Sequence, residues 1–142
     1  MIIKIAKEFK WEMSHRLTFH KGPCRNIHGH TYRLLVEIAG EPNENGMVMD
    51  YYDLEAIVNP LIMRLDHSFL CDENDKIMID FLRANDFKHY IIPPTTTAEN
   101  IARYLLDYFI PQFQKFKNIR ELMIRFQETE DVYAEISHKF DL

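Results

Sequence analysis

Residues 2–17 read IIKIAKEFKWEMSHRL, and apolar side chains occupy every second position over most of this stretch. In an extended chain successive side chains point to opposite faces, so a two-residue period is typical of a strand with one buried face. The alternation weakens only around Lys7. We therefore predict a long half-buried strand whose core-facing side chains are Ile3, Ile5, Phe9, Trp11 and Met13.

A second strand is predicted over residues 28–40, HGHTYRLLVEIAG, because β-branched and aromatic residues are frequent there. Turn-forming residues follow in EPNENG, and a helical pattern then begins within residues 47–65. Asp50 or Asp53 can cap this helix at its N-terminus. Its apolar stripe contains Leu54, Ile57, Val58, Leu61 and Ile62.

The second half of the chain is predicted to begin with a polar loop, LDHSFLCDENDK, over residues 65–76. A short helical stretch follows around residues 77–83. Residues 91–97, IIPPTTT, are expected to be extended, because Pro93 and Pro94 exclude a helix there.

The clearest helix is TAENIARYLLDYFIPQF at residues 97–113, with Thr97 as the N-cap and Asn100 three residues later. Two strands, 119–129 and 131–140, follow around the short turn TED, which suggests a hairpin. The expected order is ββααββ, an α+β fold with an antiparallel sheet and two helices on one face.

The composition fits one globular domain over residues 1–142, with 46% hydrophobic and 27% charged residues. A net charge of −5 without a basic block argues against nucleic-acid or membrane-surface partners. We find no signal-peptide pattern and no run of the roughly 18 apolar residues that a membrane helix needs. Cys24 and Cys71 are too few for a disulfide framework, so we expect reduced thiols in a cytoplasmic protein.

Three histidines are candidates for a metal site. His28 and His30 are two residues apart on the second strand, so both imidazoles lie on one face, roughly 6–7 Å apart at Cα. If the first two strands pair as a hairpin, His15 reaches the same place. Three imidazoles with an open fourth position are typical of a catalytic zinc, although an isolated His-x-His is also common without a metal.

Cys24 admits two interpretations. As a fourth zinc ligand its thiolate would close the site and make it structural. Displaced from the metal, the thiol would instead be acidified by the nearby zinc charge and act as a base or nucleophile. The spacing of the residues leaves both interpretations open.

Other polar residues are candidates for acid–base chemistry and substrate binding. Asp66 directly precedes His67, and a carboxylate beside an imidazole can fix its tautomer, although a capping aspartate and a surface histidine are the more common explanation of such a pair. Glu128 lies at a strand end, where it is either solvated or able to accept two parallel hydrogen bonds from an amino-pyrimidinone edge. Thr96 and Thr97 offer groups for an anion or a polar ring edge at a helix start, where N-capping is the alternative.

Six short segments together carry a resemblance to a known family. They are MSHRL, CRNIHGHTY, GMVMDY, LDHSFL, PTTTAENIA and QETEDVYAEI, and they occur in the family's order. The chain resembles the 6-pyruvoyl-tetrahydropterin synthase / 6-carboxy-tetrahydropterin synthase family over nearly its whole length. The resemblance implies a tunnelling fold that closes into a barrel, a homohexamer of two stacked trimers, and active sites between subunits.

The resemblance also implies roles for particular residues. Zinc would be held by His15, His28 and His30, and Cys24 would be the catalytic cysteine. Asp66 and His67 would complete the proton-transfer machinery, and Glu128 would anchor the pterin ring. Arg16, Lys21 and Arg25 are candidates for binding a triphosphate, and Cys71 stands where the family usually has asparagine.

Three residues separate Cys24 from His28, and this short spacing resembles the bacterial queuosine-pathway branch. That branch converts 7,8-dihydroneopterin triphosphate to 6-carboxy-5,6,7,8-tetrahydropterin, with release of acetaldehyde and triphosphate. The alternatives are a 6-pyruvoyl-tetrahydropterin synthase and a non-enzymatic zinc- or pterin-binding protein.

Overall fold

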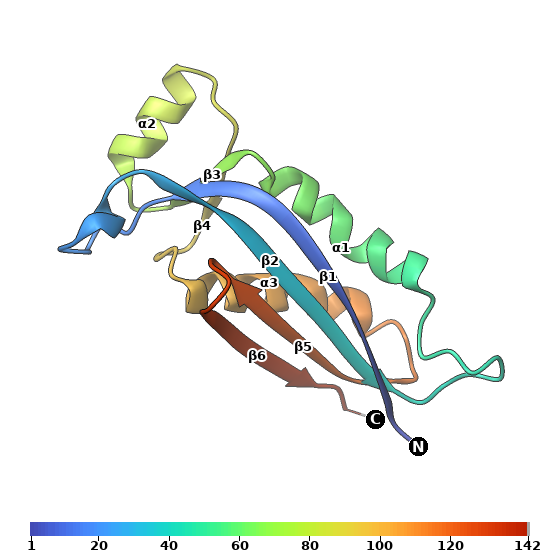
Figure 1. Ribbon diagram of the computed structural model, residues 1–142. Helices are drawn as coiled ribbons and strands as arrows, with labels where there is room; N and C mark the ends of the chain where they lie inside the picture. The colour runs from blue at the N-terminus through green and yellow to red at the C-terminus, as the bar shows by residue number, and fades with distance from the viewer. Residues whose placement is uncertain (142) are drawn as a thin grey trace.

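The computed structural model describes residues 1–141, in which six strands form one sheet in the order β4-β3-β1-β2-β5-β6 (Figure 1). No helix in this part of the chain is long and apolar enough to cross a membrane. The elements are β1 Ile3–His15, the short 3-10 helix η1 Pro23–Arg25, β2 His28–Gly40, α1 Tyr51–Leu65, β3 Ser68–Asp72, α2 Lys76–Ala84, β4 His89–Ile92, α3 Ala98–Phe113, β5 Ile119–Gln127 and β6 Tyr133–Lys139.

The long hairpin of β1 and β2 is the centre of the sheet. The two strands pair antiparallel along their whole length, from Ile3 opposite Gly40 to His15 opposite His28. The predicted bounds of the second strand are confirmed, and the predicted alternation places Phe9, Trp11 and Met13 in the core. Ile5 is only half-buried, and the prediction that Ile3 faces the core was wrong, because Ile3 is exposed where β1 begins. β5 and β6 extend the sheet antiparallel beyond β2, which confirms the predicted C-terminal hairpin.

Helices α1 and α3 cover one face of this sheet (Figure 1). Asp50 caps α1 by accepting a hydrogen bond from the N–H of Tyr52 at 2.8 Å, and Thr97 caps α3 by accepting from Asn100 at 3.2 Å. The predicted stripe of α1 is buried except for half-buried Ile57. The α+β class and the antiparallel framework are therefore confirmed.

The prediction of a polar loop over residues 65–76 was wrong. This segment contains β3, and every residue of β3 is buried. β3 pairs parallel with the end of β1 and with β4, so the sheet gains two short strands. The helical stretch predicted around residues 77–83 is confirmed as α2, the third helix. The sequence does not reveal this strand for two reasons. Acidic residues lie on either side of SFLC, and a short strand that is buried on both faces shows no alternation of polar and apolar residues.

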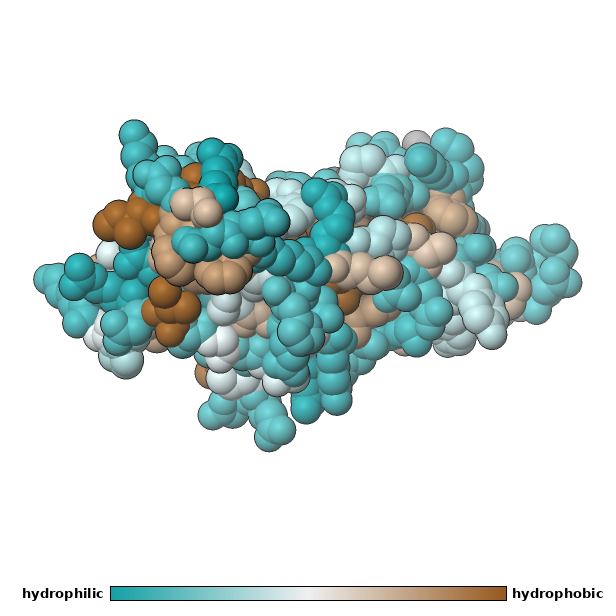
Figure 2. Space-filling model, turned by 90° about the horizontal axis from the view of Figure 1, so that it is seen from above, coloured by the Kyte–Doolittle hydropathy of each residue, from teal (hydrophilic) through white to brown (hydrophobic). Residues whose placement is uncertain are grey.

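Helix α2 packs on the other side of this added edge from α1 and α3. Phe69 and Cys71 of β3 pack with Met78 and Leu82 of α2, whereas Leu70 between them belongs to the main core. Figure 2 shows hydrophobic side chains gathered at the α2 end of the molecule. The end of the β1–β2 hairpin therefore lies between the main core and α2.

Candidate active site

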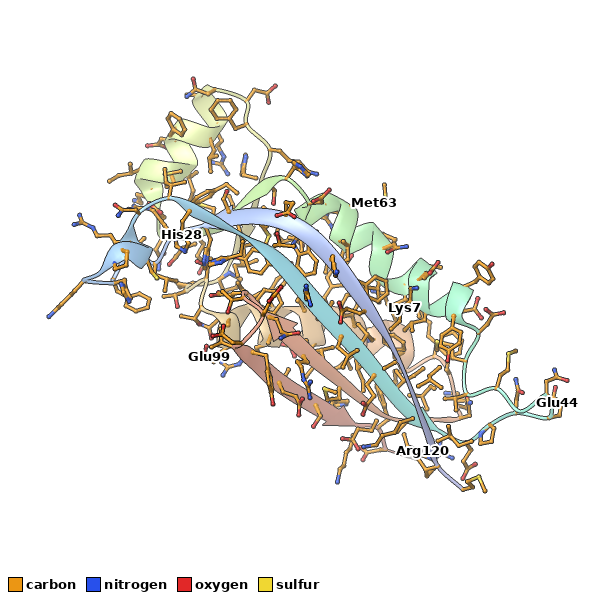
Figure 3. The ribbon with its side chains drawn as sticks, viewed as in Figure 1. Lys7, His28, Glu44, Met63, Glu99 and Arg120 are labelled. Carbon is orange, nitrogen blue, oxygen red and sulfur yellow. The ribbon has the colours of Figure 1, made fainter. Side chains whose placement is uncertain are left out.

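Three histidines meet where the core face of the hairpin ends. Along β1 the core-facing positions run Trp11, Met13, His15, and the register sets His15 opposite His28 and Met13 opposite His30. The candidate ligand atoms of the three imidazoles all lie within 4.8 Å of one another. Figure 3 shows His28 at the end of β2 beside η1. The core stripe thus changes from apolar to imidazole side chains at its last positions.

Backbone carbonyls fix the tautomers of two of these rings. Nδ1 of His15 donates to the carbonyl of Thr96 at 2.9 Å, and Nδ1 of His28 donates to the carbonyl of Asn26 at 2.7 Å. A carbonyl can only accept, so each Nδ1 carries the proton and each Nε2 carries a free lone pair. In metal sites, a hydrogen bond from the ring nitrogen that does not bind the metal commonly orients the histidine in this way.

The donor set fits a divalent metal ion. Nε2 of His15 and Nε2 of His30 are buried and have no hydrogen-bond partner among residues 1–141. Buried polar atoms without partners are unfavourable and rare, whereas a metal bound by imidazole nitrogens satisfies them. Three imidazoles without a fourth protein ligand match the donor set of catalytic zinc sites.

The surroundings keep two of these imidazoles neutral at pH 7. Burial lowers the pKa of His15 to about 4, and a positive charge on His28 would lower it further. Burial and His28 also lower the pKa of His30. A neutral imidazole is the form that binds a metal, so little proton competition opposes binding at these two positions near neutral pH.

Glu128 lies directly beside the imidazoles, just past the end of β5. Its two carboxylate oxygens are each 3.9 Å from an Nε2 atom, one of His15 and one of His30. Burial raises the pKa of this carboxyl, an effect that His28 partly offsets. Glu128 and Thr97 also line a pocket of about 290 Å³. The carboxylate therefore borders both the imidazoles and a space for a small molecule.

The two threonines predicted to bind substrate have different surroundings. Thr97 lines the pocket beside Glu128, although its hydroxyl oxygen also caps α3. Thr96 is fully buried, its carbonyl accepts from His15, and its hydroxyl donates to the carbonyl of Arg16 at 3.1 Å. Thr96 is therefore placed to hold the end of β1 through its carbonyl and its hydroxyl.

Cys24 lies in η1, in the connection between the two strands that carry the histidines. The residue is half-buried, and its carbonyl accepts from the N–H of Leu17 at 2.8 Å. Among residues 1–141, its sulfur does not belong to the group of converging ligand atoms. This arrangement favours a thiol beside the imidazoles over a fourth ligand.

Asp66 and His67 form a hydrogen-bonded pair at the edge of β1. Nδ1 of His67 donates to Oδ1 of Asp66 at 2.9 Å, and the same oxygen accepts the N–H of Glu12 at 3.0 Å. The hydrogen bond from Glu12, with smaller help from His67, lowers the pKa of Asp66. The backbone of His67 is in the left-handed region, with φ 59°, and its N–H donates to the carbonyl of Glu12. Nε2 of this exposed imidazole is thus presented outward.

This pair lies beside the opposite face of the hairpin from the metal cluster. His67 lines a pocket of about 630 Å³ whose walls include Glu12, Ser14, Gly29 and Thr31. The side chains of Glu12, Ser14 and Thr31 alternate along the strands with the three histidines and point to the other face, and His30 also contributes to the lining of this pocket. Within residues 1–141, the polar partners of the two side chains are each other and the backbone N–H of Glu12, and none of them is Cys24.

Some residues around the site escaped sequence reasoning. Asn26 was missed, and Thr96 was predicted only for substrate binding, because both contact the histidines through backbone carbonyls, which carry no side-chain signal. Arg16, a candidate for triphosphate binding, has its guanidinium engaged by Asp75 at 2.7 and 2.8 Å. Asp75 precedes a helical stretch, so its capping role was detectable, but its bond to Arg16 was not.

The fold and the site together define a class of protein: an α+β domain with a three-histidine centre at the end of a long hairpin, next to a half-buried carboxylate. The chain belongs to the 6-pyruvoyl tetrahydropterin synthase family, whose profile matches residues 4–139. The family resemblance predicted from the six motifs is thereby confirmed.

Relatives and solved structures agree with this placement. The chain is 37% identical over 145 residues to the 6-carboxy-5,6,7,8-tetrahydropterin synthase of Haemophilus influenzae, covering 94% of this chain and 98% of that protein. It is 28% identical to the enzyme of the same name from Rickettsia conorii, covering 95% and 100%.

Two solved structures share the fold at low sequence identity. The 6-pyruvoyl tetrahydropterin synthase of Plasmodium vivax superposes with a TM-score of 0.79 at 20% identity, covering 99% of each chain. An uncharacterized protein from Wolinella succinogenes superposes with a TM-score of 0.82 at 21% identity, covering 96% of this chain and 98% of that one.

Proposed function

We propose that this chain is a zinc-dependent 6-carboxy-5,6,7,8-tetrahydropterin synthase. It converts 7,8-dihydroneopterin triphosphate to 6-carboxy-tetrahydropterin and releases acetaldehyde and triphosphate. The observation that carries the proposal is the group of three imidazoles, two of them with buried and unpaired Nε2 atoms, beside Glu128. The relative that is 37% identical bears the same name, and the short Cys24–His28 spacing favours the same branch.

His15, His28 and His30 would hold the zinc ion. When bound, zinc acts as a Lewis acid toward the hydroxyl groups of the substrate side chain, which makes the adjacent carbon-bound proton more acidic. The lowered pKa values of His15 and His30 support this role, because a neutral imidazole is the form that binds a metal, and the carbonyl contacts of His15 and His28 orient these two rings.

Glu128 anchors the pterin ring in this proposal. A carboxylate accepts two parallel hydrogen bonds from an amino-pyrimidinone edge, as it does from a guanidinium group. The pocket that Glu128 and Thr97 line lies next to the imidazoles, so a ring held there would present its side chain toward them. Lys21 and Arg25 remain the candidates for the triphosphate, since Asp75 engages Arg16.

Cys24 removes a proton as the thiolate or returns one as the thiol, and His67, oriented by Asp66, is the complementary acid or base. His67 lines the pocket on the face of the hairpin opposite to the three imidazole side chains, so we assign the Asp66–His67 pair to the site of a neighbouring chain. That arrangement requires a homo-oligomer, and we propose a hexamer of two stacked trimers. The free thiols of Cys24 and Cys71 are in keeping with a cytoplasmic protein.

The test is incubation of the purified, metal-analysed protein with 7,8-dihydroneopterin triphosphate, followed by mass detection of products. We expect acetaldehyde and 6-carboxy-tetrahydropterin. An intact three-carbon side chain on the product would assign the 6-pyruvoyl reaction instead. Bound zinc without turnover would indicate a non-enzymatic zinc- or pterin-binding protein.

A pair of cysteine variants tests the role of Cys24. We expect Cys24→Ala to retain zinc and to lose turnover by at least about 100-fold, because it removes a proton-transfer group. Cys71→Ala is the matched control, since the second thiol lies under α2 and should leave turnover intact. Loss of zinc in Cys24→Ala would instead identify Cys24 as a ligand.

A further inference from the structure

A buried ion pair connects α2 to the residue that follows a metal ligand. Arg16 comes directly after His15, and its guanidinium faces the carboxylate of Asp75. Nε of Arg16 donates to Oδ2 at 2.7 Å, and Nη2 donates to Oδ1 at 2.8 Å. The side chain of Asp75 is only 3% exposed and that of Arg16 17% exposed. Both members of the pair are therefore largely withdrawn from solvent.

The two-point geometry makes this contact directional. Arginine and carboxylate join here through two parallel hydrogen bonds, which fix the orientation of both groups as well as their distance. Oδ1 of Asp75 also accepts the N–H of Met78 at 3.3 Å, so the same carboxylate caps α2. The guanidinium of Arg16 is thus held by the residue that caps α2, 59 residues later in the sequence.

Thr96 connects the backbone of Arg16 to the imidazole ring of His15. Its hydroxyl donates to the carbonyl of Arg16 at 3.1 Å, and its own carbonyl accepts Nδ1 of His15 at 2.9 Å. The chain after β1 is therefore held from two sides, by Asp75 through the guanidinium and by Thr96 through the backbone. A shift of Arg16 would move the Thr96 hydroxyl contact and with it the carbonyl that orients His15.

We propose that Asp75, acting through Arg16, is a positioning residue for His15 as a metal ligand. This inference rests on the proposed metal-binding role of the three histidines and adds a residue outside their motifs. Ligand nitrogens must be held closely for three imidazoles to bind one ion, and contacts behind the ligands supply that restraint. The alternative is that the ion pair merely anchors α2.

The variant Asp75→Asn separates these two roles. Asparagine has nearly the same shape and is an equally good N-cap, so Oδ1 can still accept from Met78. The amide nitrogen that replaces Oδ2 cannot accept from Nε of Arg16, so the two-point contact is lost. Arg16→Lys is the second variant, because lysine keeps the charge but lacks the planar fork.

Two controls accompany these variants. Leu82→Ala weakens the packing of α2, in which Leu82 is buried with Met78 and Phe69, without altering either partner of the pair. Glu135→Ala removes the exposed contact of Glu135 with Arg125, also an Arg–carboxylate pair, whose Nε and Nη2 lie 3.0 and 2.9 Å from Oε1. The first control tests the stability of α2 and the second tests the general loss of such a pair.

The measurement is the zinc dissociation constant of each full-length variant, obtained by competition with a chromophoric chelator, with folding checked by circular dichroism. We expect Asp75→Asn to weaken zinc binding by about 10- to 100-fold, as for other residues that orient ligands. We expect a smaller loss in Arg16→Lys, and both controls within about twofold of wild type.

Each outcome decides between the two roles. Wild-type affinity in folded Asp75→Asn, or in Arg16→Lys should Asp75→Asn fail to fold, would overturn the inference. An equal loss of affinity in Leu82→Ala would also overturn it, because the pair would then act only through α2. Failure of the wild-type protein to bind zinc would contradict the proposed function itself, and this inference with it.

Discussion

At the scale of single residues, the two cysteines have the same chemistry and opposite surroundings. Cys24 is half-buried in η1, whereas Cys71 is fully buried among Phe69, Met78 and Leu82. Burial, followed by the charges of Asp75 and Asp72, raises the pKa of Cys71 to about 11. A thiol reacts as the thiolate, so burial and the raised pKa make Cys71 unreactive, whereas Cys24 is accessible for reaction.

We predict that alkylation distinguishes the two thiols. Iodoacetamide at pH 8 should modify Cys24 in the native protein, and Cys71 only after unfolding, because access and thiolate formation are both suppressed at the buried position. Peptide mass mapping of native and urea-unfolded samples measures this. Equal modification of both cysteines in the native protein would contradict the burial of Cys71.

The raised pKa of Cys71 also predicts how stability changes with pH. Between pH 9 and pH 11 the unfolded thiol loses its proton while the folded thiol keeps it, so the folded state binds more protons. Stability therefore falls as pH rises through this window. From pH 7.5 to pH 10 the wild-type protein should lose about 1 kcal/mol more free energy of unfolding than Cys71→Ala, measured by urea denaturation. Parallel losses in both proteins would show that the thiol does not contribute.

At the scale of elements, the helices follow local signals and the added strands do not. Asp50 and Thr97 cap α1 and α3 as predicted, because an N-cap acts on groups only two or three residues away. β3 was missed because its burial depends on α2 on one side and the main core on the other. Its parallel pairing with β1 joins residues far apart in sequence.

The cap of α1 provides a prediction at this scale. Asp50→Ala should lower the free energy of unfolding by about 1 kcal/mol, because the N–H of Tyr52 loses its acceptor. Asp50→Asn keeps an acceptor oxygen and should retain most of this free energy. Urea denaturation followed by circular dichroism measures both variants, and equal stability of the two would refute the capping role.

At the scale of the whole molecule, the sheet ends in strand edges that are open in a single chain. Within residues 1–141, β6 pairs only with β5, and β1 meets β3 only at Met13 and Ser14, which leaves most of its outer edge without a strand partner. Exposed edges tend to pair with other chains, and closure into a barrel removes them. We therefore predict that native mass spectrometry finds six copies of the 17.0 kDa chain.

The proposed sharing of active sites between chains is testable by complementation. Cys24→Ala and His67→Ala should each be inactive alone. Random mixed oligomers of the two should regain activity in about a quarter of their sites, because each restored site takes Cys24 from one chain and His67 from another. Co-expression with two affinity tags isolates the mixed oligomers. Inactive mixed oligomers would indicate that both groups act within one chain.

The sequence by itself determined the features that depend on near neighbours. Alternation predicted β1 and β2, the caps followed from single residues, and parity placed His28 and His30 on one face. The six motifs identified the family, because several short patterns in a set order rarely coincide by chance.

Only the tertiary structure decided what depends on distant partners. Thr96 meets His15 across 81 residues, and Asp75 meets Arg16 across 59 residues. The Asp66–His67 pair lies beside the opposite face from the imidazoles because β3 joins the outer edge of β1. Such contacts depend on the register and packing of elements far apart in the chain, which local periodicity and single-residue preferences do not encode.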